Sequence, residues 1–253
     1  MTRLGLTGWC RCLLPVTAAA LVLVGQTPRG NQDTSIPGAS KHTPIFVQAD
    51  QLPARDLLEA PPANDSAETK SELAELHRIQ DSRTPAQVAQ AQVDDREEDI
   101  FVYREVVGEK LDPTRLPLTA ALSGKVHSDE DVIVSPTKTY FGRPRPFMID
   151  PSIHPVCKHD ADFSYPSGHS TTGYLEAFLL AEMVPEKREP ILKRADSYAY
   201  DRVVCGVHFP SDVHASRYVA AAMFGFLLNN PDFMQEFKAA KKETRSALGL
   251  PLN

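Results

Sequence analysis

Three short segments of the sequence hold most of the residue types that bind or transfer an anionic group. The first runs Lys138-Thr-Tyr-Phe-Gly-Arg143-Pro-Arg145-Pro and places three cations within eight residues. Guanidinium groups donate paired hydrogen bonds to phosphate oxygens, and the two prolines stiffen the backbone that carries them. The segment therefore predicts an anion site at Lys138 and Arg145, although a solvated basic cluster on the surface has the same composition.

The second segment, Tyr165-Pro-Ser-Gly-His169, stands immediately before an apolar run. Ser167 is a favoured N-cap, and Gly168 allows the backbone to approach a ligand closely. A helix N-terminus offers free N–H groups and the positive end of the helix dipole, and both favour an anion. We therefore expect His169 at the rim of an anion pocket, with an ordinary N-cap turn as the alternative.

The third segment runs Asp201-Arg202-Val-Val-Cys-Gly-Val-His208-Phe-Pro-Ser-Asp212. His208 and Asp212 are four residues apart, so at the start of a helix they would share a face, and the carboxylate would fix the imidazole tautomer. An oriented imidazole is a better nucleophile or base through its other nitrogen. The same spacing also occurs by chance in proteins without such chemistry.

The three segments together resemble the signature of the PAP2 superfamily in their order and spacing. The matching strings are Lys-x6-Arg-Pro, then Pro-Ser-Gly-His, then Arg-x5-His-x3-Asp, and they span residues 138–212. The surrounding sequence, from about residue 60 to 248, looks most like the bacterial class A non-specific acid phosphatases. One position departs from the family pattern, because Asp201 stands where a serine is usual; its carboxylate would either clamp Arg202 or repel a phosphate dianion.

The resemblance implies an acid phosphatase that needs no metal or other cofactor and hydrolyses small phosphomonoesters of broad range. It implies that His208, oriented by Asp212, attacks phosphorus to form a phosphohistidine, and that His169 is the general acid and then the general base. The residues that it assigns to phosphate binding are Lys138, Arg145, Ser167, Gly168 and Arg202. Arg143 is expected to support the site or to lie on the surface, and His127 is expected to be solvated.

Three other functions compete with this interpretation. A vanadium-dependent haloperoxidase has a similar pocket because vanadate mimics phosphate, and the motifs alone do not distinguish it. A lipid phosphate phosphatase normally has several membrane-spanning helices, which this sequence lacks. A phosphate-binding protein without turnover would not require the pair of histidines, His208 and His169.

The elements that must position these residues are predicted to be helices. Asp65 followed by Glu68 resembles a capping box before a helix over 66–81, and Thr84-Pro85 indicates the start of a second helix. Further helices are predicted over 173–184, 213–228 and 231–248, the last amphipathic and rich in lysine. Because strand alternation is scarce, the sequence favours an all-α fold, and the resemblance implies a compact PAP2-type, vanadium haloperoxidase-like domain.

The chain is expected to consist of three parts. Residues 1–25 are typical of an export signal, with Arg3 and Arg11 before or within an apolar run, although a membrane anchor is the alternative. Residues 26–62 form a proline-rich arm, and residues 63–253 form the phosphatase domain. This organisation predicts a periplasmic or secreted protein with no stable membrane insertion after the signal is cleaved.

The net charge bears on the possible binding partners, and the cysteine content bears on disulfide formation. The net charge is -6, so no overall basic field favours nucleic acid or an anionic membrane, and any anion site must be built locally. Cys157 and Cys205 are the cysteines that would remain after export, and they form either one disulfide or two separate buried thiols. The sequence leaves the oligomeric state open, a homo-oligomer included.

Overall fold

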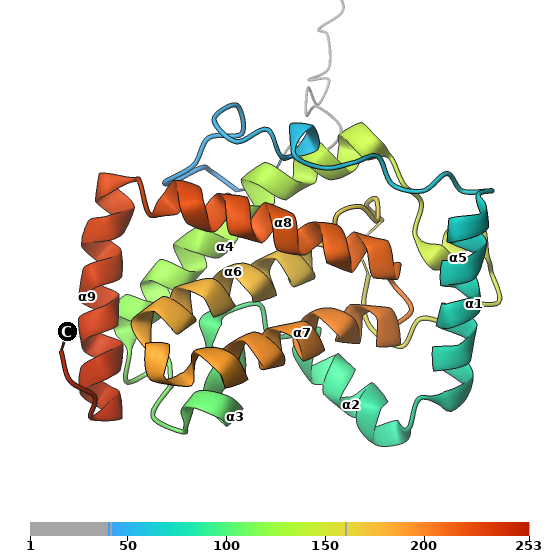
Figure 1. Cartoon of the computed structure of the whole chain (residues 1–253). Helices are drawn as coiled ribbons and strands as arrows, with labels where there is room; N and C mark the ends of the chain where they lie inside the picture. Colours follow the sequence, from blue (N-terminus) through green and yellow to red (C-terminus); the bar gives the residue numbers. More distant parts are fainter. Residues whose placement is uncertain (1–39, 41, 160, 253) are drawn as a thin grey trace, which may run out of the picture. The chain divides into compact units, whose positions relative to one another are not determined.

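The computed structural model describes residues 40, 42–159 and 161–252, and within these residues every regular element is a helix (Figure 1). The α-helices are α1 (Ala67–Ser82), α2 (Pro85–Asp94), α3 (Arg104–Val107), α4 (Pro117–Phe141), α5 (Pro146–Ile149), α6 (Gly168–Met183), α7 (Arg188–Val204), α8 (Pro210–Leu227) and α9 (Pro231–Leu248). Short 3-10 helices lie at Ala54–Asp56, Ile100–Tyr103 and Pro185–Lys187. The prediction of an all-α fold is confirmed.

Local capping explains where the first two helices begin. Ser66 accepts a hydrogen bond from the backbone N–H of Thr69 (3.1 Å), so the cap of α1 is Ser66 and not the predicted Asp65. Thr84 caps α2 in a full capping box with Gln87, and a proline occupies the first helical position. The predicted starts of both helices agree with the structure to within one residue.

The two apolar helices begin earlier than the apolar pattern predicts. Helix α6 starts at Gly168, because Ser167 accepts a hydrogen bond from the backbone N–H of Ser170 (3.3 Å) and so fixes the first turn. Helix α8 starts at Pro210, whose fixed φ suits the first helical position. Helix α9 has the predicted bounds, Pro231–Leu248.

Helices α4 and α7 were not predicted from the sequence. Helix α4 contains Gly124 and Pro136, which lower helix propensity, and α7 is polar along much of its length. Burial outweighs propensity in both cases, since α4 buries Leu122 and Val126 and α7 packs against α6. These two helices supply two of the cations described below.

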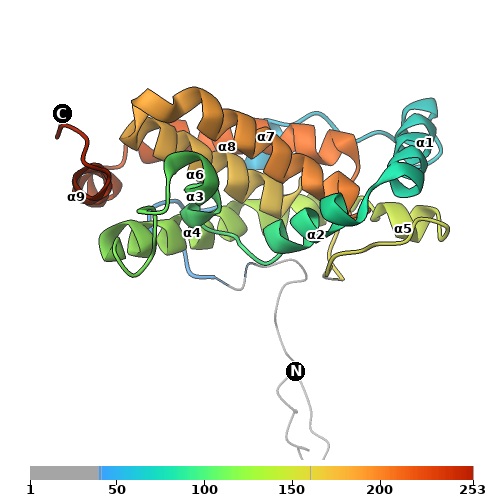
Figure 2. The same ribbon diagram turned by 90° about the horizontal axis from the view of Figure 1, so that it is seen from below.

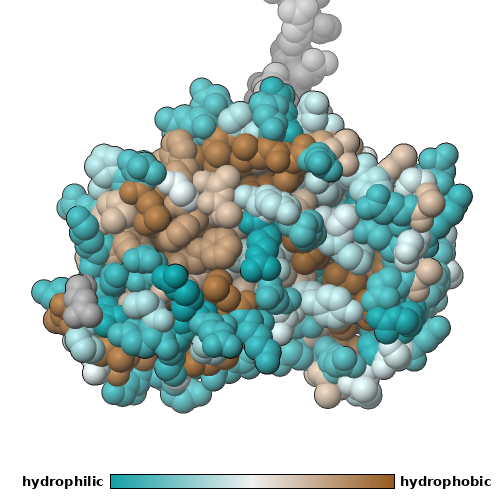
Figure 3. All heavy atoms as spheres, in the orientation of Figure 1, coloured by the Kyte–Doolittle hydropathy of each residue, from teal (hydrophilic) through white to brown (hydrophobic). Residues whose placement is uncertain are grey.

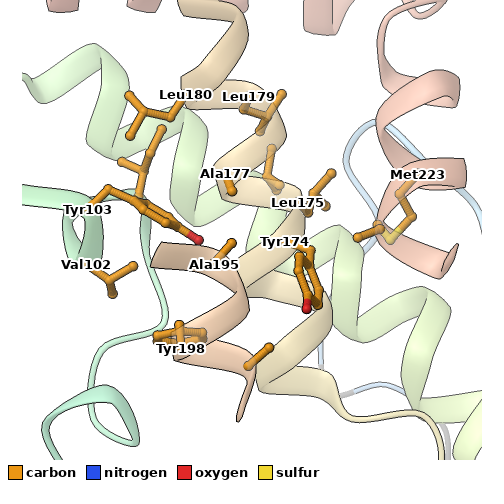
Figure 4. Packing of buried hydrophobic residues seen from close by; sticks show 14 of the residues in the cluster. Val102, Tyr103, Tyr174, Leu175, Ala177, Leu179, Leu180, Ala195, Tyr198 and Met223 are labelled. Atoms are coloured by element: carbon orange, nitrogen blue, oxygen red, sulfur yellow. The ribbon is translucent and has the colours of Figure 1, made fainter. Parts of the chain in front are cut away.

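Helix α6 is the central helix of the domain. It packs against α7 and α8 over most of its length and also against α4 (Figures 1 and 2). Twelve of its 16 residues are buried, as expected for a helix that others enclose. Figure 4 shows Leu175 and Leu180 of α6 in the core together with Ala195 of α7 and Met223 of α8. This packing fixes the N-terminus of α6, where the second motif lies.

Helices α6 and α7 are in tight contact at Gly173 and Tyr198. A Cβ atom at Gly173 would lie 2.4 Å from the Tyr198 ring, which is closer than any side chain tolerates. On the same turn the hydroxyl of Tyr103 donates a hydrogen bond to the carbonyl of Gly173 (2.5 Å), and Figure 4 shows both tyrosines beside α6. The absence of a side chain at Gly173 therefore sets the distance between the two helices.

The described part of the proline-rich arm packs on the helices. Phe46 and Val47 are buried, and the ring of Phe46 makes an edge contact with Phe233 of α9 (centroids 5.4 Å apart). The carboxylate of Asp129 accepts hydrogen bonds from the backbone N–H groups of Ile45 (2.7 Å) and Phe46 (2.9 Å). The arm thus contributes to the core from residue 46 onward. The predicted signal, residues 1–25, lies outside the described residues.

A disulfide joins Cys157 to Cys205 at a Cα–Cα distance of 5.3 Å. Of the two arrangements that the sequence left open, the structure therefore has the disulfide. Cys205 is the C-cap of α7, and Cys157 lies in the segment between α5 and α6. The bond ties these two segments together three residues before His208.

The surface seen in Figure 1 carries apolar side chains over α6 and α8, bordered by polar ones (Figure 3). The partly buried rings of Phe178 of α6 and Phe224 of α8 contact each other, with centroids 5.8 Å apart. None of the helices in the described ranges combines the length and the apolar character that a membrane span requires.

Candidate active site

The three sequence motifs meet at one cavity. Lys138 lies in the last turn of α4, Arg145 is the N-cap of α5, His169 lies in the first turn of α6, Arg202 lies in the last turn of α7, and His208 lies in the turn before α8. All five side chains line a cavity of about 570 Å³. The fold therefore brings five of the eight predicted site residues to the same cavity, although they come from five different elements.

The other three predicted residues lie beside or behind this cavity. Gly168 lines an adjoining cavity of about 590 Å³, which shares Lys138 and His169 with the first. Ser167 and Asp212 are fully buried and line neither cavity. The side chain of Ser167 caps α6, and its backbone N–H donates to the carbonyl of Asp212 (3.3 Å). Ser167 thus has its predicted place as the N-cap of α6, and its contact with phosphate stays a prediction.

His208 is 1% exposed, and each of its ring nitrogens faces a polar group. Nδ1 lies 3.2 Å from Oδ2 of Asp212, and Nε2 lies 3.1 Å from Nη1 of Arg145. A carboxylate only accepts and a guanidinium only donates, so this network assigns the proton to Nδ1 and the lone pair to Nε2. His208 precedes Phe209, the N-cap of α8, so the pair meets across the start of the helix and not along one helical face as predicted.

Four donors converge on the carboxylate of Asp212. Besides His208, these are the backbone N–H of Phe209 (2.9 Å), the hydroxyl of Ser164 and Nη1 of Arg143 (2.6 Å). Burial raises the pKa of Asp212 to about 6, and the opposing effects of Arg143 and Ser164 are smaller. Asp212 is therefore a fixed acceptor that holds the His208 ring in one orientation above that pH.

Arg143 supports the histidine–aspartate pair from inside the protein. It is 2% exposed, and its second terminal nitrogen donates to Glu72 of α1 (2.8 Å). The guanidinium carbon also lies 3.9 Å from the centroid of the Phe209 ring. Of the two positions expected for Arg143, the supporting one is correct. Helix α1 is connected through it to Asp212.

Asp162 lies between the two cations of the first motif. Its carboxylate accepts from Lys138 and from Arg145, and its backbone carbonyl accepts from Nε of Arg145 (3.2 Å). Lys138 and Arg145 lower the pKa of Asp162, although burial opposes them. A carboxylate and a phosphate offer these cations the same kind of oxygen acceptor. Within the described residues, no group of His, Cys, Asp or Glu side chains is arranged to hold a metal ion.

Arg202 is held by Asp95 and not by its neighbour Asp201. Nη1 of Arg202 lies 2.5 Å from Oδ1 of Asp95, in the loop after α2. Asp201 instead hydrogen-bonds to Asp94, and burial together with that like charge raises the pKa of Asp201 to about 8. Asp94 also pairs with Arg194 (2.7 Å). Asp201 is thus a proton-bearing partner of Asp94 at neutral pH, and it neither clamps Arg202 nor repels an anion there.

His169 lies at the border of the two cavities and is partly exposed. Its Nε2 is 3.2 Å from Oε1 of Glu98 and 3.2 Å from the carbonyl oxygen of Asp95. Burial and the nearby charge of Arg202 hold the pKa of His169 well below its usual 6.5. Burial also holds the pKa of His208 well below that value, and Arg145 adds to the effect. Both imidazoles are therefore neutral at neutral pH.

Sequence reasoning missed five acidic residues that line the two cavities: Asp95, Glu98, Glu130, Asp131 and Asp162. No spacing pattern signals them, because all five lie outside the three motifs. His127, which was expected to be solvated, is partly buried beside His42 and lines the second cavity. Burial lowers its pKa, and the neighbouring His42 adds to this effect.

Comparison with known proteins gives one family and a small set of relatives. Residues 117–233 match the PAP2 superfamily. A non-specific acid phosphatase of Salmonella typhimurium is 32% identical over 149 residues, which are 56% of this chain and 59% of that protein. An acid phosphatase of Zymomonas mobilis is 32% identical over 151 residues, which are 57% of this chain and 56% of that protein. The matched part thus spans less than two thirds of these relatives.

One solved structure shows the same fold. A bacterial vanadium-dependent iodoperoxidase superposes with a TM-score of 0.52 at 18% identity and covers 70% of this chain and 53% of its own. At this identity the likeness concerns the fold alone. It confirms the predicted architecture, a helical domain like that of the vanadium haloperoxidases.

Proposed function

We propose that this chain is an acid phosphatase that hydrolyses phosphate monoesters through a phosphohistidine, because residues 117–233 match the PAP2 superfamily and its relatives include a non-specific acid phosphatase. The observation that carries the proposal is the environment of His208. One nitrogen of its ring is bonded to Asp212, and the other faces the cavity beside Arg145. A nitrogen lone pair so placed is suited to attack an anion that Arg145 holds.

In the proposed reaction, Nε2 of His208 attacks phosphorus, and the bond from phosphorus to the alcohol oxygen breaks. Lys138, Arg145 and Arg202 balance the charge on the three equatorial oxygens, together with the N–H groups at the start of α6. His169 protonates the leaving alcohol oxygen. It then takes a proton from the water that cleaves the phosphorus–nitrogen bond and releases inorganic phosphate. This scheme needs positive charge and proton transfer, and the side chains of the cavity supply both.

Substrate and Asp162 would compete for the same two cations. A phosphate that binds Lys138 and Arg145 must displace the Asp162 carboxylate, because that carboxylate accepts from both. The loop that carries Asp162 therefore moves, or its side chain rotates, when substrate binds. This exchange lowers affinity for phosphate and favours release of the product.

A panel of phosphomonoesters assayed with and without chelator tests the proposed function. We expect phosphate release from p-nitrophenyl phosphate, a sugar phosphate and a nucleoside monophosphate, unchanged by EDTA and inhibited by vanadate. The reason is that the proposed pocket binds the phosphoryl group through cations and N–H groups. Activity that EDTA removes and a divalent ion restores would contradict the proposal. Halide oxidation by peroxide with added vanadate, without phosphate release, would favour a haloperoxidase.

The rate is expected to depend on pH with a maximum on the acid side of neutrality. His208 must be neutral and Asp212 ionised, so activity falls as the pH drops below the pKa of either group. His169 must be protonated, so activity also falls as the pH rises through its lowered pKa. A bound phosphate dianion raises that pKa again. We expect a maximum between about pH 5 and 6.5.

The measurement is kcat/KM and kcat against pH for an ester with a poor leaving group, which depends on His169. The alkaline limb of kcat should lie at higher pH than that of kcat/KM, since the bound dianion stabilises the protonated imidazole. A rate that rises steadily into alkaline solution would argue for a metal-bound hydroxide instead.

We also infer that the enzyme works outside the cytoplasm, in the periplasm or as a secreted protein. The support is the signal-like sequence of residues 1–25 together with the Cys157–Cys205 disulfide, since such bonds persist in oxidising compartments. Fractionation of the producing cells tests this, with the mature N-terminus determined by mass spectrometry. A full-length chain found in the cytoplasm would contradict it.

A further inference from the structure

The cavity that adjoins the phosphate pocket has a volume of about 590 Å³ and begins at His169. If His169 protonates the leaving oxygen, the alcohol half of the substrate must occupy this cavity. One face of α4 forms its wall, because Glu130, Asp131 and Lys138 recur at helical spacing. The cavity therefore contacts the part of the substrate that differs from one phosphomonoester to another.

Acidic groups dominate this cavity. Besides Asp162 at the phosphate end, Glu98, Glu130 and Asp131 line it. Glu98 contacts His169 (3.2 Å), Asp131 accepts from the hydroxyls of Ser40 and Ser135 (2.6 Å each), and Glu130 has a hydrogen bond to the side chain of Thr172. Acidic residues on their own do not define a binding site, but Glu130 differs from the others in a way that points to a ligand.

Glu130 is 4% exposed, and its Oε1 atom has no hydrogen-bond partner within the described part of the chain. Burial raises the pKa of Glu130 well above its usual range, and Glu98 and Asp131 add to the shift, whereas Lys138 opposes it. A buried carboxyl oxygen without a partner is costly, so without a bound cation the raised pKa favours the protonated form of Glu130, whereas an ammonium beside Oε1 would stabilise the ionised form and lower that pKa again. The histidine at the far end does not supply the cation, because burial lowers the pKa of His127.

The unpartnered oxygen lies next to the phosphate pocket. A Cβ atom on Gly168 would be 3.6 Å from Oε1 of Glu130 and 3.9 Å from Nζ of Lys138, so both atoms lie close to the same point. A phosphate held by Lys138 therefore lies close to Glu130, and its ester group would enter the cavity that Glu130 lines.

We propose that this cavity selects phosphomonoesters whose alcohol carries an ammonium group next to the ester, as in 2-aminoethyl and choline phosphates. Glu130 is the residue that recognises the ammonium, and Glu98 and Asp131 add to the negative field around it. The inference rests on the proposed phosphatase function and specifies its substrate class.

A pair of esters of equal shape tests the inference: choline phosphate and 3,3-dimethylbutyl phosphate, which differ in a trimethylammonium against a tert-butyl group. Choline is also the better leaving group, so the quantity to compare is the ratio of the two kcat/KM values in wild type and in Glu130→Gln. We expect the ratio for choline phosphate over 3,3-dimethylbutyl phosphate to be at least about tenfold lower in the variant than in the wild type. This is the effect of losing one contact to a charged group.

Glu176→Gln is the matched control. Glu176 is a buried carboxyl whose Oε2 also has no described partner, but it lines neither cavity and bonds to Ser123 (2.7 Å). This variant should keep the wild-type ratio. An unchanged ratio in Glu130→Gln would overturn the inference while leaving the phosphatase proposal intact. Failure of the wild type to hydrolyse p-nitrophenyl phosphate or either ester would instead refute the phosphatase proposal.

If Glu130→Gln does not fold, inhibition of the wild type decides the question. Choline and 3,3-dimethylbutanol are added as inhibitors of p-nitrophenyl phosphate hydrolysis. We expect choline to inhibit at a concentration at least about tenfold lower, for the same reason. Equal inhibition by the charged and the neutral alcohol would overturn the inference.

Discussion

Replacement of His208 by alanine is expected to lower kcat by about four powers of ten or more, the usual effect of removing a nucleophile that acts as part of a unit. Nε2 of His208, the ring nitrogen that does not contact Asp212, lies beside Arg145 at the cavity. Among the described residues, no other imidazole has both an orienting carboxylate and that position. The measurement is phosphate release from p-nitrophenyl phosphate by the purified variant. A variant that keeps a tenth of the wild-type rate would remove His208 from its proposed role.

Two further variants separate the nucleophile from the general acid. His169→Ala should still form a phosphoenzyme from p-nitrophenyl phosphate, because that leaving group needs little protonation, but it should be nearly inactive on an alkyl phosphate. Rapid quenching followed by detection of acid-labile phosphohistidine distinguishes the two cases. His214→Ala is the control, since His214 is exposed and contacts Tyr218 (3.2 Å) outside the cavity. It should behave as the wild type.

Replacement of Arg143 by methionine is expected to lower the free energy of unfolding by about 3–5 kcal/mol, the usual cost of leaving buried charges without a partner. Arg143 is almost fully buried and bonds to both Asp212 (2.6 Å) and Glu72 (2.8 Å). Methionine keeps much of the volume against the Phe209 ring but removes the charge, so two carboxylates lose their common cation. Denaturant unfolding followed by circular dichroism measures the change.

Arg217→Met is the matched control for that measurement. Arg217 pairs with Asp196 on the surface, where both side chains are about half exposed (50% and 52%). Exposed pairs contribute about 0–1 kcal/mol, so this variant should change stability little. If Arg143→Met costs no more than Arg217→Met, the buried network around Asp212 does not stabilise the fold as described.

Local signals explain why much of the fold was predictable. Capping side chains and prolines mark helix starts within a few residues of chain, as at Thr84 and Pro231, and the structure confirms these predictions. Helix α7 has no such signal, and α4 has only Pro117 at its first position, so the stability of both comes mainly from burial against neighbouring helices and not from their own composition. Propensity read from the sequence contains no information on that packing.

The candidate site likewise has residues that the sequence predicts and residues that it does not. Fixed spacings predicted which side chains would meet, and the structure brings Lys138, Arg145 and His208 to one cavity. Their chemical roles stay predictions until the variants are measured. The carboxylates around them lie outside the motifs: Asp95 comes from a loop far away in the sequence, and Glu130 comes from α4, about two turns before Lys138. Only the fold places them, so no motif could have found them.

The contact between Gly173 and Tyr198 has a consequence for how the pocket tolerates change. Gly173 lies one helical turn after His169, and Tyr198 lies one turn before Arg202, so this tight contact of α6 and α7 is one turn from both pocket residues. A methyl group at 173 would act as a wedge between the helices, and α7 would carry Arg202 away from His169. The width of a polar pocket is therefore decided inside the apolar core, by one missing methyl group.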